Sequence, residues 1–283
     1  MRQIILGTAF ALMAAGTNAE TVKFAVTDME GMEQLKTEFG AFEQALGETT
    51  GLDIELFPVS SRTAAVEAIN SGNIDLVLTG PAEYVVMKEL AAPIIVTAWQ
   101  RPDYYAQIVV LSDSGIDDVQ DLKGKTIAFG SVGSTSQHLG PAQVLADFGL
   151  AYNSDYKPQI INRNVAVEAM IRGDIDAIGM NRGHLDAIRD AFQEQSFTVI
   201  ARGRDLPNDI LVARKDLDPQ IIAAVKDAFV SHGSDLMAAV LNGEDNQKFR
   251  GGHFLTRVED ANYEYVRSMY ATIGVDTKAF VGD

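Results

Sequence analysis

The sequence of 283 residues has no cysteine, one tryptophan and only four histidines. Without cysteine the chain forms no disulfide, has no thiolate metal ligand and has no cysteine nucleophile. It also lacks the cysteine that carries the lipid of a lipoprotein, so we expect no covalent membrane anchor. The histidines do not form a pair four residues apart around a glutamate. We therefore expect no metal site and no cofactor.

Long apolar runs are absent except near the start of the chain. Residues 4–15 are mostly apolar, follow Arg2, and precede the small residues of Thr17-Asn18-Ala19. This is the three-part form of a secretory signal with its cleavage site. The run is shorter than the roughly 20 apolar residues that a membrane helix needs. We expect residues 1–19 to be a cleaved signal peptide and the protein to be periplasmic.

Positive charge is scarce in this chain. Lysine and arginine number 23 against 39 acidic residues, which gives a net charge of -16, and loss of Arg2 with the signal would make it -17. Such a surface repels nucleic acid and anionic lipid, so we expect no nucleic-acid partner, and any anion selectivity has to be local. Removing 19 of the 283 residues leaves 264. That is more than one hydrophobic core usually supports, which favours two lobes.

Apolar periodicity predicts a regular alternation of strands and helices. In the first part we expect strands over 21–27, 53–59, 74–79 and 93–99, with helices over 32–46, 63–70 and 81–89. In the second part we expect strands over 107–111, 125–129, 158–162, 174–179, 197–201 and 210–213, with helices over 137–148, 165–171 and 184–192. A helical tail over 219–231, 235–241 and 262–273 has no strand after about residue 213. This order predicts an α/β fold of mainly parallel sheets covered by helices.

A short internal similarity supports two related lobes. Residues 65–75 (AVEAINSGNID) are similar to residues 166–176 (AVEAMIRGDID). In both, a helix ends at glycine and an Ile-Asp pair opens the next strand. We expect the chain to cross to the second lobe near Tyr105 and to return near residue 204. Lobe one then comprises 20–105 plus 204–283, and lobe two comprises 106–203, with the ligand in the cleft between them.

The most informative motif is residues 130–136 (GSVGSTS), between the strand predicted over 125–129 and the helix predicted from Gln137. A glycine-rich turn that leads hydroxyl side chains onto a helix N-terminus gathers unpaired N–H groups, O–H donors and the positive end of the helix dipole. This arrangement suits an oxyanion. The alternative is a well-capped helix without a ligand, because serine and threonine are ordinary N-caps.

Three runs of the sequence resemble the periplasmic solute-binding proteins of ABC importers for phosphonates, phosphite and related phosphorus oxyanions. They are residues 74–84 (IDLVLTGPAEY), residues 113–129 (DSGIDDVQDLKGKTIAF) and Ser134-Thr135-Ser136. The resemblance extends from about residue 21 to about residue 260. It implies the two-lobed type II periplasmic binding protein fold, a small anionic ligand, and an ABC permease of the inner membrane as partner. We expect the protein to be a monomer.

The resemblance also implies roles for individual residues. It places the hydroxyls that grip the ligand at Ser134, Thr135 and Ser136. The family's ligand-facing tyrosines align with Tyr84 and Tyr105. Alternatively, each of these residues is an aromatic of the core or of the rim of the cleft without contact to the ligand. The acidic residue at the cleft falls on Asp209, which as an alternative is a solvated loop residue.

The chain departs from the family pattern at three positions. Gln137 stands where the family usually has glycine, so it narrows the pocket or adds a donor. Arg163, or a neighbouring asparagine in a shifted register, aligns with the family's ligand-binding histidine and would supply a fixed charge unless it is a surface arginine. Gly183 aligns with the glutamate that pairs the amine of aminophosphonates. Because Asp209 alone is a poor ammonium site, we expect a small oxyanion such as phosphite or methylphosphonate rather than 2-aminoethylphosphonate.

Two other functions would also fit parts of the sequence. An enzyme would need an activated nucleophile, for which Ser136 with His138 is the nearest pair, but Gly133-Ser134-Thr135-Ser136-Gln137 lacks the second glycine of a nucleophile elbow. We therefore expect no catalytic residues. A binding protein that informs a sensor kinase or chemoreceptor would use the same clamp, since closure creates a surface that any partner can read. The sequence leaves import and sensing open.

Overall fold

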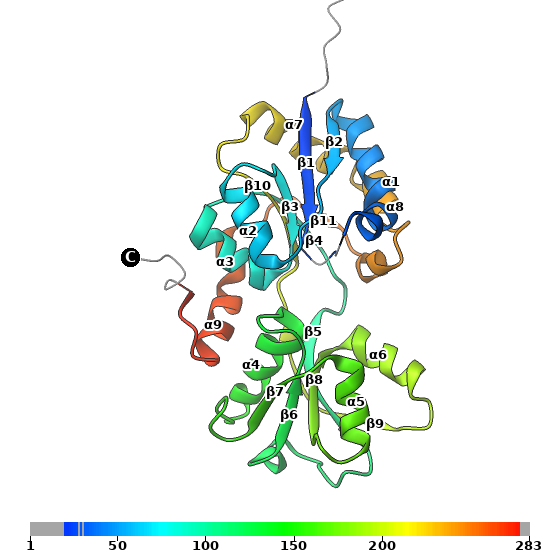
Figure 1. Ribbon diagram of the computed structural model, residues 1–283, viewed down its shortest axis with the longest axis vertical. Coiled ribbons are helices and arrows are strands. Elements are labelled where there is room, and N and C mark those ends of the chain that lie inside the picture. The colour runs from blue at the N-terminus through cyan, green and yellow to red at the C-terminus, as the bar shows by residue number, and fades with distance from the viewer. Residues whose placement is uncertain (1–19, 28, 30, 278–283) are drawn as a thin grey trace, which may run out of the picture.

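The computed structural model describes residues 20–27, 29 and 31–277. Two sheets form the centres of two lobes, which lie one above the other in Figure 1. The predicted signal peptide, residues 1–19, lies outside the described residues. No helix within the described ranges is long and apolar enough to cross a membrane.

The sheet of lobe one has the strand order β11-β4-β10-β3-β1-β2. Its strands are β1 (Thr21–Val26), β2 (Asp53–Leu56), β3 (Leu76–Thr79), β4 (Ile94–Trp99), β10 (Asp209–Ala213) and β11 (Phe254–Leu255). β1 pairs in parallel with β2 and β3, whereas β10 and β11 run antiparallel to their neighbours. The expectation that no strand follows residue 213 is wrong. β11 has two residues, too few to show any period in the sequence.

Helices cover both faces of this sheet (Figure 1). They are α1 (Met32–Thr50), α2 (Arg62–Asn70), α3 (Pro81–Ala91), α7 (Pro219–Ser231) and α8 (Gly233–Val240). α1 buries Phe39 and Phe42, three residues apart and therefore on one side of the helix, against the sheet. Trp99 of β4 lies 5.1 Å from Phe42, measured between ring centroids. This aromatic cluster makes lobe one a firm support for the cleft.

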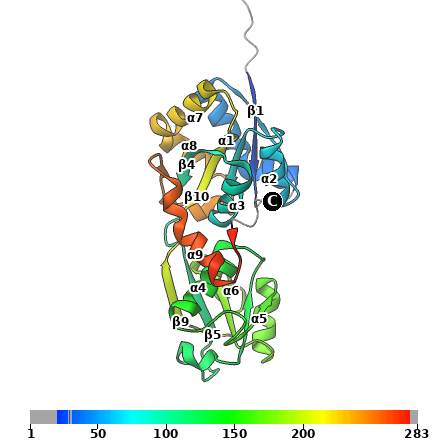
Figure 2. The same cartoon turned by 90° about the vertical axis from the view of Figure 1, so that its left-hand side faces the viewer.

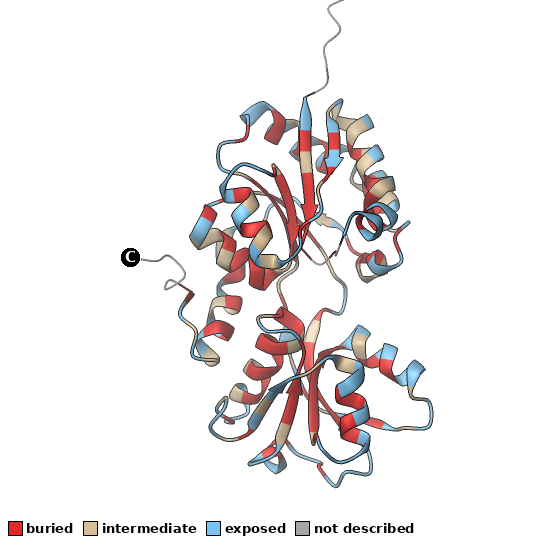
Figure 3. Cartoon of the chain, viewed as in Figure 1, coloured by how far each residue is buried: buried red, intermediate tan, exposed pale blue. Residues whose placement is uncertain are grey.

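The sheet of lobe two has the order β7-β6-β8-β5-β9. It comprises β5 (Tyr105–Leu111), β6 (Thr126–Phe129), β7 (Lys157–Ile160), β8 (Ala177–Asn181) and β9 (Phe197–Asp205), with helices α4 (Gly140–Asp147), α5 (Arg163–Ile171) and α6 (Arg182–Ala191). β6 is parallel to β7 and β8, and β5 is antiparallel to β8 and β9. The central strands of both sheets are buried between the helices, whereas the edge strands β2, β7 and β9 are partly exposed (Figure 3). The predicted two-lobed α/β fold is confirmed, with sheets that are mixed.

Two short segments connect the lobes, one after β4 and one before β10 (Figure 1). They are hydrogen-bonded to each other. The N–H of Leu206 donates to the carbonyl of Tyr104 at 2.8 Å, and the N–H of Arg101 donates to Oδ1 of Asn208 at 3.0 Å. The connection therefore holds Arg101 and Tyr104 in place at the level of the cleft.

The C-terminal helix α9 (Glu264–Thr272) lies beside α4 of lobe two and also contacts α3 of lobe one (Figure 2). The Tyr270 hydroxyl donates to the carbonyl of Ala82 at 3.2 Å. The Thr272 hydroxyl donates to Oε1 of Gln143 at 2.5 Å. This helix thus touches both lobes on one side of the cleft.

Candidate functional site

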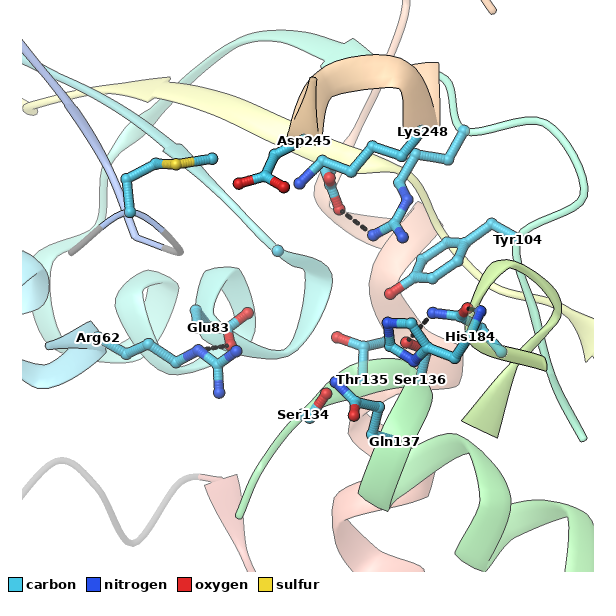
Figure 4. A pocket seen from close by; sticks show the side chains of 15 residues that line it. Arg62, Glu83, Tyr104, Ser134, Thr135, Ser136, Gln137, His184, Asp245 and Lys248 are labelled. Carbon is cyan, nitrogen blue, oxygen red and sulfur yellow. Dashed lines mark hydrogen bonds and ion pairs between the residues drawn. The ribbon is translucent and has the colours of Figure 1, made fainter. Parts of the chain in front are cut away.

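A cavity of about 330 Å³ opens between the lobes (Figure 4). Its size is at the low end of the range of about 300 to 1,000 Å³ that is common for small-ligand sites. The residues that line it come from both lobes and from the connection: Met29, Arg62, Gly80, Glu83, Arg101, Tyr104, Ser134, Thr135, Ser136, Gln137, Asn181, His184, Asp209, Asp245 and Lys248.

The hydroxyl loop forms the lobe-two wall of this cavity. A π-helical turn, Thr135–Leu139, precedes α4, so the helical segment begins two residues earlier than the sequence predicts. Gly133 before it has a φ of +74°, a conformation that favours glycine. Ser134 occupies the N-cap position, yet its side chain makes no capping hydrogen bond. Capping therefore does not explain the Ser134 hydroxyl, which lies at the cavity.

The other two hydroxyls of the loop are oriented by their neighbours. Oγ1 of Thr135 accepts a hydrogen bond of 3.0 Å from the backbone N–H of Ala82 in lobe one. Oγ of Ser136 accepts one of 2.9 Å from the Asn181 amide. Oδ1 of Asn181 in turn accepts from the N–H of His184 at 2.9 Å and caps α6. Both hydroxyls are nearly fully buried and keep a proton to donate.

Gln137 lies against Gly130 at the other end of the loop. A methyl group at position 130 would come within 2.6 Å of Oε1 of Gln137 and 2.7 Å of its Cβ. The backbone N–H of Gly130 also donates to the carbonyl of Gln137 at 2.9 Å. Glycine at 130 is therefore what lets the Gln137 side chain lie along the cavity wall.

Arginines and carboxylates alternate around the lobe-one side. Arg101 lies 3.5 Å from Asp209, and its guanidinium stacks 3.8 Å above the ring of Tyr104. Arg62 of α2 pairs with Glu83 of α3 at 2.5 Å. The guanidinium groups are thus held by carboxylates at the cavity and keep further donors.

Two titratable side chains in the cavity have shifted pKa values. Burial raises the pKa of Tyr104 to about 12, with Arg101 opposing this shift, so its phenol stays protonated and can donate. Burial, together with the charges of Arg163, Arg101 and Lys248, lowers the pKa of His184 to about 3. His184 is therefore neutral near pH 7. Its Nδ1 is buried and has no hydrogen-bond partner.

Of the eight residues that the sequence assigns to the site, Ser134, Thr135, Ser136, Gln137 and Asp209 line the cavity, and Tyr84, Tyr105 and Arg163 do not. Tyr84 is fully buried, and its hydroxyl donates to Asp260 at 2.8 Å. The ring of Tyr105 lies under the guanidinium of Arg202, 3.7 Å away. Arg163 opens α5, and its buried Nε has no partner, although its charge acts on His184.

Sequence reasoning missed most of the charged lining. Tyr104 rather than Tyr105 lines the cavity, as expected where neighbouring side chains on an extended segment point in opposite directions. Glu83 belongs to the same matched run as Tyr84 and was detectable there. Asp245 and Lys248 come from the C-terminal part of the chain, where no pattern marked them. Glu83 and Asp245 also show that Asp209 is not the only carboxylate of the cavity.

Ser136 and His138, the nearest candidates for a nucleophile and its base, do not form a hydrogen-bonded pair. Nδ1 of His138 accepts from the N–H of Gly133 at 3.1 Å, and its Nε2 lies 2.9 Å from the Tyr152 hydroxyl. Both ring nitrogens of His138 are thus engaged away from Ser136. Across the described part of the chain, no group of three or more His, Asp or Glu side chains could hold a metal ion.

The family model for the periplasmic substrate-binding proteins of phosphonate ABC transporters matches residues 24–263. This chain belongs to that family. The members of this family are periplasmic substrate-binding components of ABC transporters.

Individual proteins are also similar to this chain. The chain is 26% identical to the phosphate-import protein PhnD of Mycolicibacterium smegmatis over an alignment of 240 residues. This alignment covers 81% of this chain and 73% of that protein. A binding component of a phosphonate ABC transporter from Pseudomonas aeruginosa superposes with a TM-score of 0.67 at 18% identity, covering 91% and 87% of the two chains. PhnD1 from Prochlorococcus marinus, solved with methylphosphonate, superposes with a TM-score of 0.71 at 16% identity, covering 90% and 98%. At these identities the two structures show a shared fold.

Proposed function

We propose that this phosphonate-family protein binds one small phosphorus oxyanion, a phosphonate or phosphite, in the cavity between its lobes, and delivers it to an ABC permease as a periplasmic monomer. The observation that carries the proposal is the buried Ser134-Thr135-Ser136 loop. It presents three hydroxyls to the cavity, and capping does not account for Ser134. The methylphosphonate of the Prochlorococcus protein is consistent with this ligand class.

The oxygen atoms of the ligand would be held by donors only. The hydroxyls of Ser134 and Ser136, the amide of Gln137 and the phenol of Tyr104 all lie at the cavity, and the positive end of the helical segment after Ser134 adds to them. Hydrogen bonds to a charged group contribute about 1.5 to 3 kcal/mol each. Micromolar affinity corresponds to a binding free energy of roughly 8 kcal/mol. Three or four such hydrogen bonds can supply this amount net of the entropy lost on association.

Asp209 and Thr135 have supporting roles in this proposal. Asp209 positions Arg101, whose guanidinium covers Tyr104. Thr135 joins the two lobes through Ala82, so the same loop that contacts the anion also closes the cleft. Closure around the ligand is how a two-lobed protein converts binding into a shape that a permease can recognise.

Calorimetry of the mature protein against methylphosphonate, phosphite, phosphate and sulfate tests the proposal. We expect micromolar or tighter binding of methylphosphonate or phosphite, and a loss of at least 100-fold in the Ser134→Ala, Ser136→Ala double variant. The matched control is Ser154→Ala with Ser234→Ala, two exposed serines whose side chains make no hydrogen bond with the described residues. If the Ser134→Ala, Ser136→Ala variant kept full affinity for the anion, the hydroxyl loop would not be part of the binding site. Binding of none of these anions would overturn the proposed function.

A further inference from the structure

We propose that His138 is a positioning residue for the anion site: its imidazole holds the backbone of Gly133 and so determines where the Ser134 hydroxyl lies in the cavity. This inference rests on the proposed function, since it concerns the loop that would contact the phosphorus oxyanion. His138 does not itself line the cavity. It would therefore act on the ligand only through the hydroxyl loop.

The Ser134 hydroxyl depends on the backbone of the loop for its position. It lies at the cavity, and no capping hydrogen bond of its side chain fixes it there. The preceding residue, Gly133, has a φ of +74°. Glycine permits this conformation but does not enforce it, because a residue without Cβ adopts many others as readily. A further contact is needed to hold the loop in one conformation before the ligand binds.

His138 supplies such a contact. Its Nδ1 accepts a hydrogen bond of 3.1 Å from the backbone N–H of Gly133. The turn between the two residues is π-helical, since the N–H of Leu139 donates to the carbonyl of Ser134, five residues earlier, at 3.0 Å. Side chains in a helical turn tilt toward its N-terminus, which brings the His138 ring back to Gly133.

The ring of His138 is itself held firmly. It is 3% exposed and packs edge-on against Phe129 of β6, with 5.7 Å between the ring centroids. Burial lowers the pKa of His138, so the ring is neutral near pH 7. Because Nδ1 accepts from Gly133, the single N–H of the neutral ring is at Nε2. That N–H donates to the Tyr152 hydroxyl, 2.9 Å away.

Two amide substitutions separate positioning from simple packing. Asparagine at 138 carries its carbonyl oxygen near the place of Nδ1, so it keeps an acceptor for Gly133 and loses the contact with Tyr152. Glutamine reaches nearer to the place of Nε2, so it does the reverse. If only the bulk of His138 mattered, the longer glutamine would replace it at least as well as asparagine.

Calorimetry with methylphosphonate and phosphite tests the role of His138. We expect His138→Gln and His138→Leu to lose affinity by about tenfold or more, and His138→Asn to stay within about threefold of the unmodified protein. His232→Leu, at the exposed end of α7, is the matched control and should keep full affinity. Circular dichroism shows that each variant is folded before it is titrated. If His138→Leu does not fold, the comparison of the two amides decides.

Nuclear magnetic resonance gives a second measurement that does not depend on affinity. In protein labelled with ¹⁵N-histidine, the signals of His138 are those missing from His138→Asn. At neutral pH they should report an unprotonated Nδ1 and a protonated Nε2.

The outcomes separate this inference from the function beneath it. Unchanged affinity in folded His138→Gln would overturn the positioning role and leave the proposed function standing. A loss in His138→Asn as large as that in His138→Gln would do the same, and so would a proton on Nδ1 of His138. If the unmodified protein binds neither anion, the proposed function fails and the positioning role fails with it.

Discussion

The hydroxyl of Thr135 accepts a hydrogen bond of 3.0 Å from the backbone N–H of Ala82, and this contact joins the two lobes across the cleft. Ala82 is the second residue of α3, and the first N–H groups of a helix have no partner within it. A side chain of lobe two therefore caps a helix of lobe one. The carbonyl of Ala82 is used as well, since it accepts from Tyr270 at 3.2 Å.

Thr135→Val is expected to weaken the closed form. Valine keeps the shape but leaves the N–H of Ala82 buried and unpaired, at a cost of about 1 to 3 kcal/mol. In the open form water would satisfy the same N–H. Because closure is coupled to binding, we expect an affinity loss of about 5- to 150-fold for the best phosphonate. Calorimetry measures the loss, and solution X-ray scattering of the ligand-free protein should show a more extended particle.

Thr135→Ser is the control for this contact. It retains the hydroxyl and should stay within a few-fold of the unmodified protein in affinity and in dimensions. Wild-type affinity and compactness in Thr135→Val would show that the lobes do not depend on this bond.

Gly130 and Gln137 are expected to be energetically coupled. Gly130→Ala places a methyl group within 2.7 Å of the Gln137 Cβ, and overpacking of this kind costs about 1 to 3 kcal/mol of stability. The strain should also push the Gln137 side chain away from the cavity wall. Gln137→Gly removes the clash, so the double variant should recover most of the lost stability. Urea unfolding of both single variants and of the double variant gives the coupling energy, and strictly additive losses would contradict the coupling.

Tyr84 and Tyr104 provide a matched pair of hydroxyls. The Tyr84 hydroxyl donates to Asp260 at 2.8 Å and does not line the cavity, so Tyr84→Phe should lose about 1 to 2 kcal/mol of stability and keep its ligand affinity within twofold. Tyr104→Phe removes a donor at the cavity and should lose affinity by about tenfold or more. Thermal unfolding and calorimetry together separate the two effects. A large affinity loss in Tyr84→Phe would restore the ligand-facing role that the sequence predicted for it.

The sequence predicts the fold well because the apolar periodicity of a short stretch is enough to indicate each strand or helix. The order of long elements and the hydroxyl loop at residues 134–136 both follow from short-range patterns. Strand direction does not, since β5 and β10 run against their neighbours only because the chain crosses between lobes. Most of the cavity lining is likewise a product of tertiary structure. Lys248 is remote in sequence from the loop it faces, and no periodicity links the two.

His184 is expected to make the protein less stable in acid. Burial and three nearby cations, Arg163, Arg101 and Lys248, lower the folded pKa of His184 to about 3, whereas a histidine in an unfolded chain titrates at about 6.5. Between these values the unfolded state binds more protons than the folded state. Stability is therefore lost as pH falls through this window, at up to about 1.4 kcal/mol per pH unit.

Substitution of His184 by glutamine removes this proton linkage. Relative to the His184→Gln variant, the unmodified protein should lose about 2 to 3 kcal/mol of unfolding free energy between pH 7 and pH 4.5. Urea unfolding of both proteins at the two pH values measures this difference, in which the contributions of the many carboxylates cancel. His232→Gln, at the exposed end of α7, is the control and should follow the unmodified protein. An equal pH dependence in His184→Gln and the unmodified protein would mean that His184 titrates in the folded state much as it does in the unfolded chain.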